Sequence, residues 1–420
     1  MPGLILAAPA SGSGKTTVTL GLLRALSRAG ASVRGAKSGP DYIDPAYHAA
    51  ATGKPCLNLD AWAMSTANIA ARAATDDLLI IEGAMGLFDG APHDGAGSSA
   101  DLARILNLPV ILIVDAARMA QSIAPLVAGF ARHDTAVRVA GIILNKVGSD
   151  RHAAMLRRAI APLGLPVLGA LPRRDDLTRP SRHLGLEQAI EDPALPAFMD
   201  RAADWVTAGC DLAALTALAQ PLPAPRANRL PPPAQRIAVA QDLAFSFFYQ
   251  HQLQDWQAAG AQVTPFSPLA DDAVPDADLI ILPGGYPELY APQIAAAKTF
   301  MQSLKKTSET TDIYGECGGY MVLGDSLTTA DGVPHAMTGL LRLNTSFAAR
   351  KLHLGYRRLH AVHGPFAGAW RGHEFHYATT TSATGDHLFA AQDATGDALP
   401  PMGLRLGRVS GSFAHIIDRA

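Results

Sequence analysis

Apolar runs and helical patterns alternate along the first half of the chain. Strands are predicted where apolar residues run without polar alternation, at 3–8, 78–82, 110–115, 139–145 and 166–171. A helix is predicted over 16–29, because its apolar residues recur at helical spacing and Gly30 provides a stop. Buried strands that alternate with helices indicate an α/β fold with a mostly parallel sheet covered on both faces.

A proline-rich segment interrupts this pattern. Residues 220–235, QPLPAPRANRLPPPAQ, contain six prolines. Proline continues neither a helix nor a central strand, so a semi-rigid linker is predicted here, with a long surface loop within one domain as the alternative. Apolar runs resume at 236–240, 279–282 and 313–314. Two α/β domains are therefore predicted, over 1–219 and 236–420.

The charge, the cysteine count and the length of the apolar stretches limit the partners and the compartment expected for this protein. The formal net charge of the 420 residues is −2, so no global basic field predicts a nucleic-acid partner. The three cysteines are too few for a disulfide framework and favour a reducing compartment. No apolar stretch reaches the roughly 18 residues of a membrane span, and the first apolar run is interpreted as a buried strand rather than a signal peptide. A cytoplasmic protein without a membrane partner is predicted.

A phosphate-binding loop is predicted between the first strand and the first helix, at ASGSGKTT. Gly12 and Gly14 allow backbone N–H groups to close on phosphate oxygens, and Lys15 can reach the outer phosphates. The Thr16 hydroxyl can bind Mg²⁺. Ser11, Ser13 and Thr17 complete the predicted ATP-binding set within the loop. Pro9 replaces the glycine of the usual pattern, but a simple glycine-rich turn would not explain a lysine followed by two threonines.

Carboxylates near this loop are candidate metal ligands. Glu82 ends a predicted strand, where open α/β sheets bind ligands, and carboxylate oxygens suit Mg²⁺. A surface acid at a strand end is the alternative. The segment KSGPDYIDP follows the second predicted strand and is a candidate second metal or acceptor loop, although alone it would be a solvated turn. Its candidate residues are Lys37, Asp41, Tyr42 and Asp44, with Asp41 also a candidate metal ligand.

A second site is predicted at GECGG, residues 315–319. The spacing G-x-C-x-G is the cysteine form of a nucleophile elbow, and the helix N-terminus that follows favours a thiolate. A buried structural cysteine is the alternative. Cys317 needs a base, and His415 in GSFAH is the candidate, although only the fold can bring the two together. Gly284 and Gly285, which follow a predicted strand, are candidate donors for an oxyanion hole.

These segments together resemble the cobyrinic acid a,c-diamide synthase family, including its hydrogenobyrinic acid form. The matching segments are ASGSGKTT, KSGPDYIDP, EGAMGLFDG, ILPGGYPE, GECGGYMVLG, RGHEFHY and GSFAH, which span nearly the whole chain. The resemblance implies a first domain similar to dethiobiotin synthetase, which binds ATP and Mg²⁺. It implies a second domain of the class I glutamine amidotransferase type.

The resemblance also implies residue roles and a reaction. Cys317 would attack glutamine, His415 would be its base, and Asn145 would read adenine. ATP would phosphorylate the a- and c-acetate groups of a corrinoid, and ammonia from glutamine would displace phosphate. Class I amidotransferases carry a glutamate two residues after the histidine, where this chain has Ile417, and the next carboxylate is Asp418. A dyad or an unassigned third member is therefore expected.

Three rival interpretations remain. Cobyric acid synthase shares both domain types but amidates four other side chains, and KSGPDYIDP and RGHEFHY favour the a,c-diamide interpretation. A nickel-sirohydrochlorin a,c-diamide synthase would perform the same chemistry on another tetrapyrrole. A P-loop partitioning ATPase commonly carries a second lysine early in its loop, and this chain has none there. Such ATPases also lack the cysteine elbow that is predicted here.

A homodimer is expected by analogy.

Overall fold

The computed structural model describes residues 2–177, 181–182, 185–186, 188–224 and 229–420. The chain divides into two compact units, Met1–Asn228 and Arg229–Ala420. The expected linker starts too early, because Gln220 and Pro221 form strand β10 (Gln220–Pro221) against Pro2 and Gly3. Proline is tolerated in this two-residue pairing, which involves only the first two residues of β1. Residues 225–228 of the expected linker lie outside the described residues.

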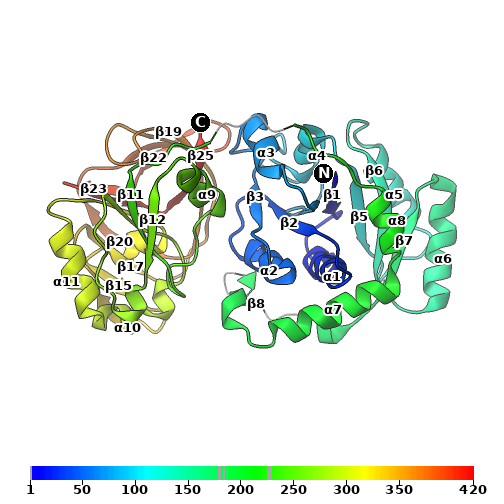
Figure 1. The fold of residues 1–420 in the computed structure, drawn as a ribbon, viewed down its shortest axis with the longest axis horizontal. Helices are drawn as coiled ribbons and strands as arrows, with labels where there is room; N and C mark the ends of the chain where they lie inside the picture. The colour runs from blue at the N-terminus through cyan, green and yellow to red at the C-terminus, as the bar shows by residue number, and fades with distance from the viewer. Residues whose placement is uncertain (1, 178–180, 183–184, 187, 225–228) are drawn as a thin grey trace. The chain divides into compact units, whose positions relative to one another are not determined.

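The first unit is built on a sheet in the order β3-β2-β4-β1-β5-β6-β7, all parallel, with β10 antiparallel to β1. Figure 1 shows β3, β2, β1 and β5 in this order across the unit. The predicted parallel α/β fold is confirmed for this unit. The predictions at 78–82 and 110–115 match to the residue, whereas the strand predicted at 139–145 continues to Val147. The strands are β1 (Pro2–Ala7), β2 (Val33–Ser38), β3 (Leu57–Leu59), β4 (Leu78–Glu82), β5 (Val110–Asp115), β6 (Val139–Val147) and β7 (Val167–Pro172), with the short β8 (Ser181–Arg182) and β9 (Gly185–Leu186) apart.

Helices cover this sheet, and α1 and α7 lie side by side (Figure 1). The helices are α1 (Lys15–Arg28), α2 (Ile43–Thr52), α3 (Thr66–Ala73), α4 (Ser99–Leu106), α5 (Ile123–Arg132), α6 (Asp150–Ile160), α7 (Leu195–Gly209) and α8 (Leu212–Ala217), with 3₁₀ turns at Ala161–Leu163, Asp175–Leu177 and Ala189–Glu191. The helix predicted over 16–29 is thus displaced by one residue. Across the described part of the chain, no helix has both the length and the apolar character needed to span a membrane.

The second unit has a central sheet in the order β12-β11-β13-β14-β24-β23, parallel except for β23. Its strands are β11 (Arg236–Ala240), β12 (Gln262–Phe266), β13 (Leu279–Leu282), β14 (Asp312–Glu316), β23 (Leu404–Leu406) and β24 (Val409–Ser412). Residues of β11 alternate between two apolar cores: Ala238 and Ala240 belong to one, and Ile237 and Val239 to the other. Both faces of this sheet are therefore buried, as expected for parallel strands.

Two further sheets accompany the central one in the second unit. The first has the order β22-β21-β18-β19-β25 and is antiparallel, and the second has the order β16-β15-β17-β20. Their strands are β15 (Ser326–Thr328), β16 (Pro334–Ala336), β17 (Arg342–Ser346), β18 (His353–Ala361), β19 (Gly368–His376), β20 (Thr379–Thr384), β21 (Phe389–Gln392), β22 (Ala398–Met402) and β25 (Ala414–Arg419). The helices are α9 (Gln250–Ala258), α10 (Ala291–Ala296), α11 (Lys298–Thr307) and α12 (Gly318–Val322), with 3₁₀ turns at Pro268–Ala270 and Pro287–Leu289.

Candidate functional site

The predicted phosphate loop joins β1 to α1. Gly12 and Gly14 have φ angles of 79° and 87°, in the left-handed region that favours glycine. The Ser13 hydroxyl donates to the Ala10 carbonyl at 2.8 Å, which closes the loop on itself. Asn145 donates its amide to the Ser13 carbonyl at 2.8 Å. Asn145 thus contacts the backbone of the loop. Its role in recognising the adenine base stays a prediction.

Lys15 is buried beside the loop, and its ammonium donates to the backbone carbonyl of Met85. Burial lowers the pKa of Lys15, and the neighbouring charge of Lys37 lowers it further. Ser11 is exposed and Thr17 is half-buried. Residues 11–17 of the predicted ATP-binding set thus lie on one loop and the start of α1, with Asn145 contacting the loop from β6, and their binding of phosphate stays a prediction.

Glu82 is the centre of a buried polar cluster at the carboxyl ends of β1, β2 and β4. Its Oε1 accepts from Thr16 Oγ1 at 2.6 Å and from Lys37 Nζ at 2.9 Å. The parallel pairing of β2 with β4 places Lys37 directly opposite Glu82. Burial alone would raise the pKa of Glu82, but the charge of Lys37 and the bond to His48 outweigh it and hold the pKa well below its usual range.

His48 is part of this cluster and was not predicted. Its Nε2 lies 2.7 Å from Glu82 Oε2, and its Nδ1 lies 3.4 Å from Cys56 Sγ. Burial lowers the pKa of His48, yet Cys56 and Glu82 raise it to about 10. The sequence held one signal: His48 follows Asp44 by four residues on α2, and residues so spaced share a helix face.

The segment 37–45 lies partly within β2. Lys37 is in that strand rather than after it, and it forms an ion pair with Asp44. Asp41 Oδ1 accepts from the backbone N–H groups of Ile43 and Asp44 at 2.8 Å each, which caps the start of α2. Tyr42 is the residue before that helix. Metal binding by Asp41, and acceptor binding by this segment, stay predictions.

The geometry at Cys317 is that of a nucleophile elbow. Cys317 joins β14 to α12 with φ 48° and ψ −102°, a strained conformation for a residue with a side chain. A Cβ on Gly319 would lie 1.8 Å from the Leu282 carbonyl oxygen, and one on Gly315 would lie 2.5 Å from Leu323. Any larger residue would clash at both positions. The turn at Cys317 therefore requires glycine at 315 and 319.

The fold brings His415 to Cys317. Strand β24 runs parallel to β14, and the Cys317 N–H donates to the Ser412 carbonyl at 2.8 Å, three residues before His415. The thiol is hydrogen-bonded to the imidazole. Burial lowers the pKa of His415, but the charges of Cys317 and Glu316 and their hydrogen bonds raise it to about 10. This arrangement places a nucleophile in contact with a candidate base.

Gly284 and Gly285 lie against this pair of residues. A Cβ on Gly284 would lie 2.5 Å from His415 Cε1 and 3.3 Å from the Cβ of Cys317. The amide nitrogen of Gly285 lies 3.0 Å from where a Cβ of Gly318 would stand. The loop after β13 therefore packs on the elbow at the place predicted for oxyanion donors, and the donor role itself stays a prediction.

Comparisons with known proteins cover both halves of the chain. Residues 4–186 match a model described as CobQ/CobB/MinD/ParA nucleotide binding domain, and residues 236–419 match CobB/CobQ-like glutamine amidotransferase domain. Proteins named hydrogenobyrinate a,c-diamide synthase from Rhizobium meliloti (strain 1021) and Sinorhizobium sp are 55% and 54% identical, over 100% of this chain and 99% of each relative. One from Rhodobacter capsulatus is 53% identical over 99% of this chain and 98% of the relative. The chain belongs to the hydrogenobyrinate a,c-diamide synthase family.

Membership of this family confirms the resemblance inferred from the sequence motifs. It also confirms the predicted order of a nucleotide-binding α/β domain followed by a glutamine amidotransferase domain. The rival class of P-loop partitioning ATPases is thereby excluded, because the relatives match this chain through both domains. Glu316, inside the matched motif GECGG, is a contact of His415 that the sequence did not predict.

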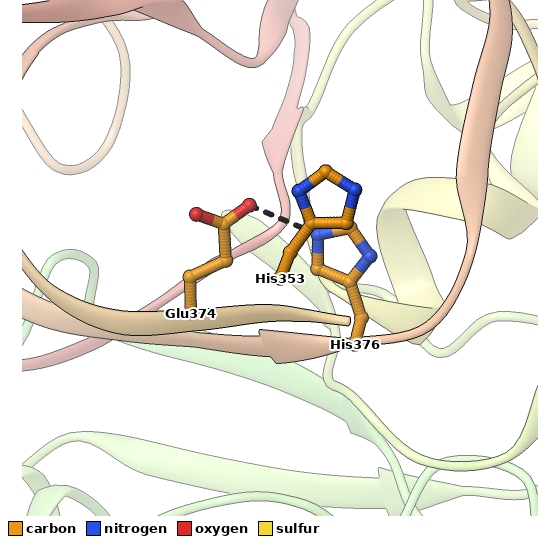
Figure 2. A group of neighbouring side chains, drawn as sticks. All are labelled: His353, Glu374 and His376. Carbon is orange, nitrogen blue, oxygen red and sulfur yellow. Dashed lines mark hydrogen bonds and ion pairs between the residues drawn. The ribbon is translucent and has the colours of Figure 1, made fainter. Parts of the chain in front are cut away.

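A third imidazole–carboxylate contact belongs to a cluster that links β18 to β19. Figure 2 shows Glu374 hydrogen-bonded to His376, with His353 stacked on the same imidazole. The ligand atoms of the three lie within 4.8 Å of one another. The two rings are nearly parallel, at 5°, and in-plane lone pairs of stacked rings do not converge on one ion. Arg357 also pairs with Glu374 at 2.7 Å, so the cluster is an ion-pair network between strands.

Proposed function

We propose that this protein converts the a- and c-acetate carboxylates of hydrogenobyrinic acid into amides, with ATP used in the first unit and glutamine in the second. The observation that carries the proposal is the similarity of the whole chain to proteins named hydrogenobyrinate a,c-diamide synthase, at 53–55% identity. Their name favours the cobalt-free acceptor over cobyrinic acid. The reaction is a glutamine-dependent, amide-forming ligation in cobalamin biosynthesis.

The second unit supplies ammonia. The Cys317 thiolate attacks the side-chain amide carbon of glutamine, and the oxyanion that forms is stabilised by backbone N–H groups at Gly284 and Gly285. The C–N bond then breaks, and His415 gives its proton to the departing ammonia. Water hydrolyses the remaining γ-glutamyl thioester, which releases glutamate and restores the thiol. The close approach of Gly284 to both His415 and Cys317, which leaves no room for a Cβ, supports this assignment.

The first unit activates the acceptor. The γ-phosphoryl group of ATP moves to an acetate carboxylate, which turns a poor leaving group into a good one, and ammonia displaces phosphate from the acyl phosphate. Lys15 lies on the phosphate loop and would hold the transferring group. The hydroxyl of Thr16 and the carboxylate of Glu82, 2.6 Å apart, are the oxygen ligands that suit Mg²⁺. When bound there, Mg²⁺ would neutralise charge on the phosphates.

The proposal also covers the compartment, the partners and the oligomeric state of the enzyme. All three cysteines are free thiols, in keeping with a reducing cytoplasm. Its partners would be small molecules, since the net charge of −2 offers no general attraction for nucleic acid. A homodimer, expected by analogy, would be tested by sedimentation of the purified protein.

The test is an incubation of the purified protein with glutamine, ATP, Mg²⁺ and either hydrogenobyrinic or cobyrinic acid, followed by mass spectrometry. A product with two amides, formed from the cobalt-free acid, is expected. The Cys317→Ala variant should form it only from added ammonia, because the nucleophile alone is removed. Glutaminase activity without amidation of either acid would contradict the acceptor assignment and leave only the amidotransferase chemistry.

A further inference from the structure

The imidazole of His415 has an acidic neighbour from an unexpected part of the chain. Ile417, two residues after the histidine, is apolar and fully buried, so its side chain cannot orient the ring. Glu316 Oε1 instead lies 3.1 Å from His415 Nδ1. Only 9% of the Glu316 side chain and 3% of the His415 side chain are exposed, so water screens this contact little.

Both oxygens of the Glu316 carboxylate are engaged. While Oε1 faces His415, Oε2 accepts the backbone N–H of Ile416 at 3.0 Å. One carboxylate thus holds two consecutive residues of β25, which fixes both the carboxylate and the strand. Because a carboxylate oxygen accepts hydrogen bonds, Nδ1 is the ring nitrogen that donates to Glu316. The other ring nitrogen is left for the hydrogen bond with Cys317.

The elbow explains how two adjacent residues reach one imidazole. Neighbouring side chains in an extended strand point to opposite faces. Glu316 is the last residue of β14, and the chain turns at Cys317, where φ is 48°. This turn changes the direction of the thiol. Glu316, at the end of β14, and Cys317, directly after it, therefore contact the same imidazole. The strained conformation at Cys317 therefore serves the carboxylate as well as the nucleophile.

We propose that Glu316 is the positioning residue of a Cys317–His415–Glu316 triad, in which the carboxylate comes from the residue before the nucleophile. It takes the place of the glutamate that the class I pattern has two residues after the histidine. This inference rests on the proposed function, since it assigns Glu316 to glutamine hydrolysis. The roles in such a triad depend on geometry and not on order in the chain.

The test is the pH dependence of glutaminase activity in Glu316→Gln. Its kcat should fall on the order of 10–100-fold, because loss of the charge and of the fixed tautomer is partly offset by the intrinsic reactivity of a thiolate. KM should not change, because both oxygens of Glu316 are engaged by His415 and the backbone of Ile416. The alkaline limb of the pH profile should move to lower pH, because the carboxylate no longer stabilises the imidazolium. Amidation from added ammonia should equal that of the wild type.

Asp418→Asn is the matched control, because Asp418 is the other buried acid near the histidine in sequence. It should keep the wild-type kcat and pH profile. A wild-type profile in Glu316→Gln, or a lowered kcat with an unmoved alkaline limb, would overturn the inference. If Glu316→Gln fails to fold, Glu316→Asp provides the same test, through a lower kcat at unchanged KM and an alkaline limb moved to lower pH. Absence of glutaminase activity in the wild type would overturn the proposed function instead.

Discussion

Three buried glutamates in this protein share one arrangement: each contacts an imidazole. Glu82 bonds to His48, Glu316 to His415 and Glu374 to His376. A buried carboxylate is costly unless it is paired and hydrogen-bonded, and an imidazole can supply both a donor and a charge. Single residues therefore couple elements that are distant in the chain, and at two of the three places the pair belongs to a candidate site.

Acid should weaken the protein through Glu374. Burial raises the pKa of this carboxyl group, but His376 and Arg357 outweigh burial and lower the pKa from 4.5 to about 2. Its stabilising contribution is therefore complete above pH 4.5 and is lost as the pH falls toward 2. The wild type should lose unfolding free energy when the pH is lowered from 7 to 3, as measured by urea titration. The same loss should be smaller by roughly 2 kcal/mol in Glu374→Gln, which has no carboxylate to protonate. The exposed Glu309→Gln control should keep the wild-type loss, and equal losses in both variants would contradict this reasoning.

At the scale of elements, the contact of α1 with α7 depends on Gly21. A Cβ there would lie 2.6 Å from Val206 Cγ2 and 2.7 Å from the Ala202 carbonyl oxygen. Replacing a helical glycine by alanine usually stabilises by about 1 kcal/mol. Here the clash should reverse the sign, and Gly21→Ala should lower the unfolding free energy by roughly 1–3 kcal/mol in urea titrations.

The matched control for this prediction is Gly129→Ala in α5, an exposed position at which a Cβ would meet nothing within 4 Å. It should stabilise by up to about 1 kcal/mol, since only propensity and chain entropy change. Both glycines lie in the first unit, so one unfolding transition reports both variants. Equal effects of the two substitutions would show that the packing of α1 on α7 can relax.

Elements with continuous apolar runs were predictable from the sequence, and strands with mixed character were not. Strands β4 and β5 match the prediction because a buried parallel strand needs apolar residues throughout. The antiparallel sheet around β18 and β19 was missed, because HLGYRRLHA and GAWRGHEFH carry charged and histidine residues that pair across strands. Strand β20, TTTSAT, is mostly exposed and gives no apolar signal at all.

Some residues of the candidate sites were also predictable from the sequence, and others were not. Lys15 and Cys317 were predictable because short-range glycine spacing determines their loops. Glu316 lay within a motif already singled out, yet its contact depends on β25 lying beside the elbow. His48 likewise depends on the pairing of β2 with β4. Glu316 carries no spacing that reveals its contact, and the spacing of His48 from Asp44 indicates only a shared helix face.

At the scale of the whole molecule, each unit has cores of its own. Among the described residues, one apolar cluster lies wholly within the first unit, and two others lie wholly within the second. Independent cores are what allow domains to fold alone. Strand β10 extends the first unit beyond residue 219, because Gln220 and Pro221 pair with β1 and Leu222 packs on Gly3.

This boundary predicts how fragments of the chain behave. A fragment of residues 1–228 should fold and amidate its acceptor from ammonia but not from glutamine, because Cys317 and His415 lie in the other unit. A fragment of residues 1–219, which ends at the boundary expected from the sequence, lacks β10. If β10 contributes about 1 kcal/mol, the shorter fragment should melt about 2–4 °C lower by circular dichroism. Equal melting temperatures would mean that β10 adds nothing to the stability of the sheet, and ammonia-dependent activity in neither fragment would mean that the first unit needs the second to work.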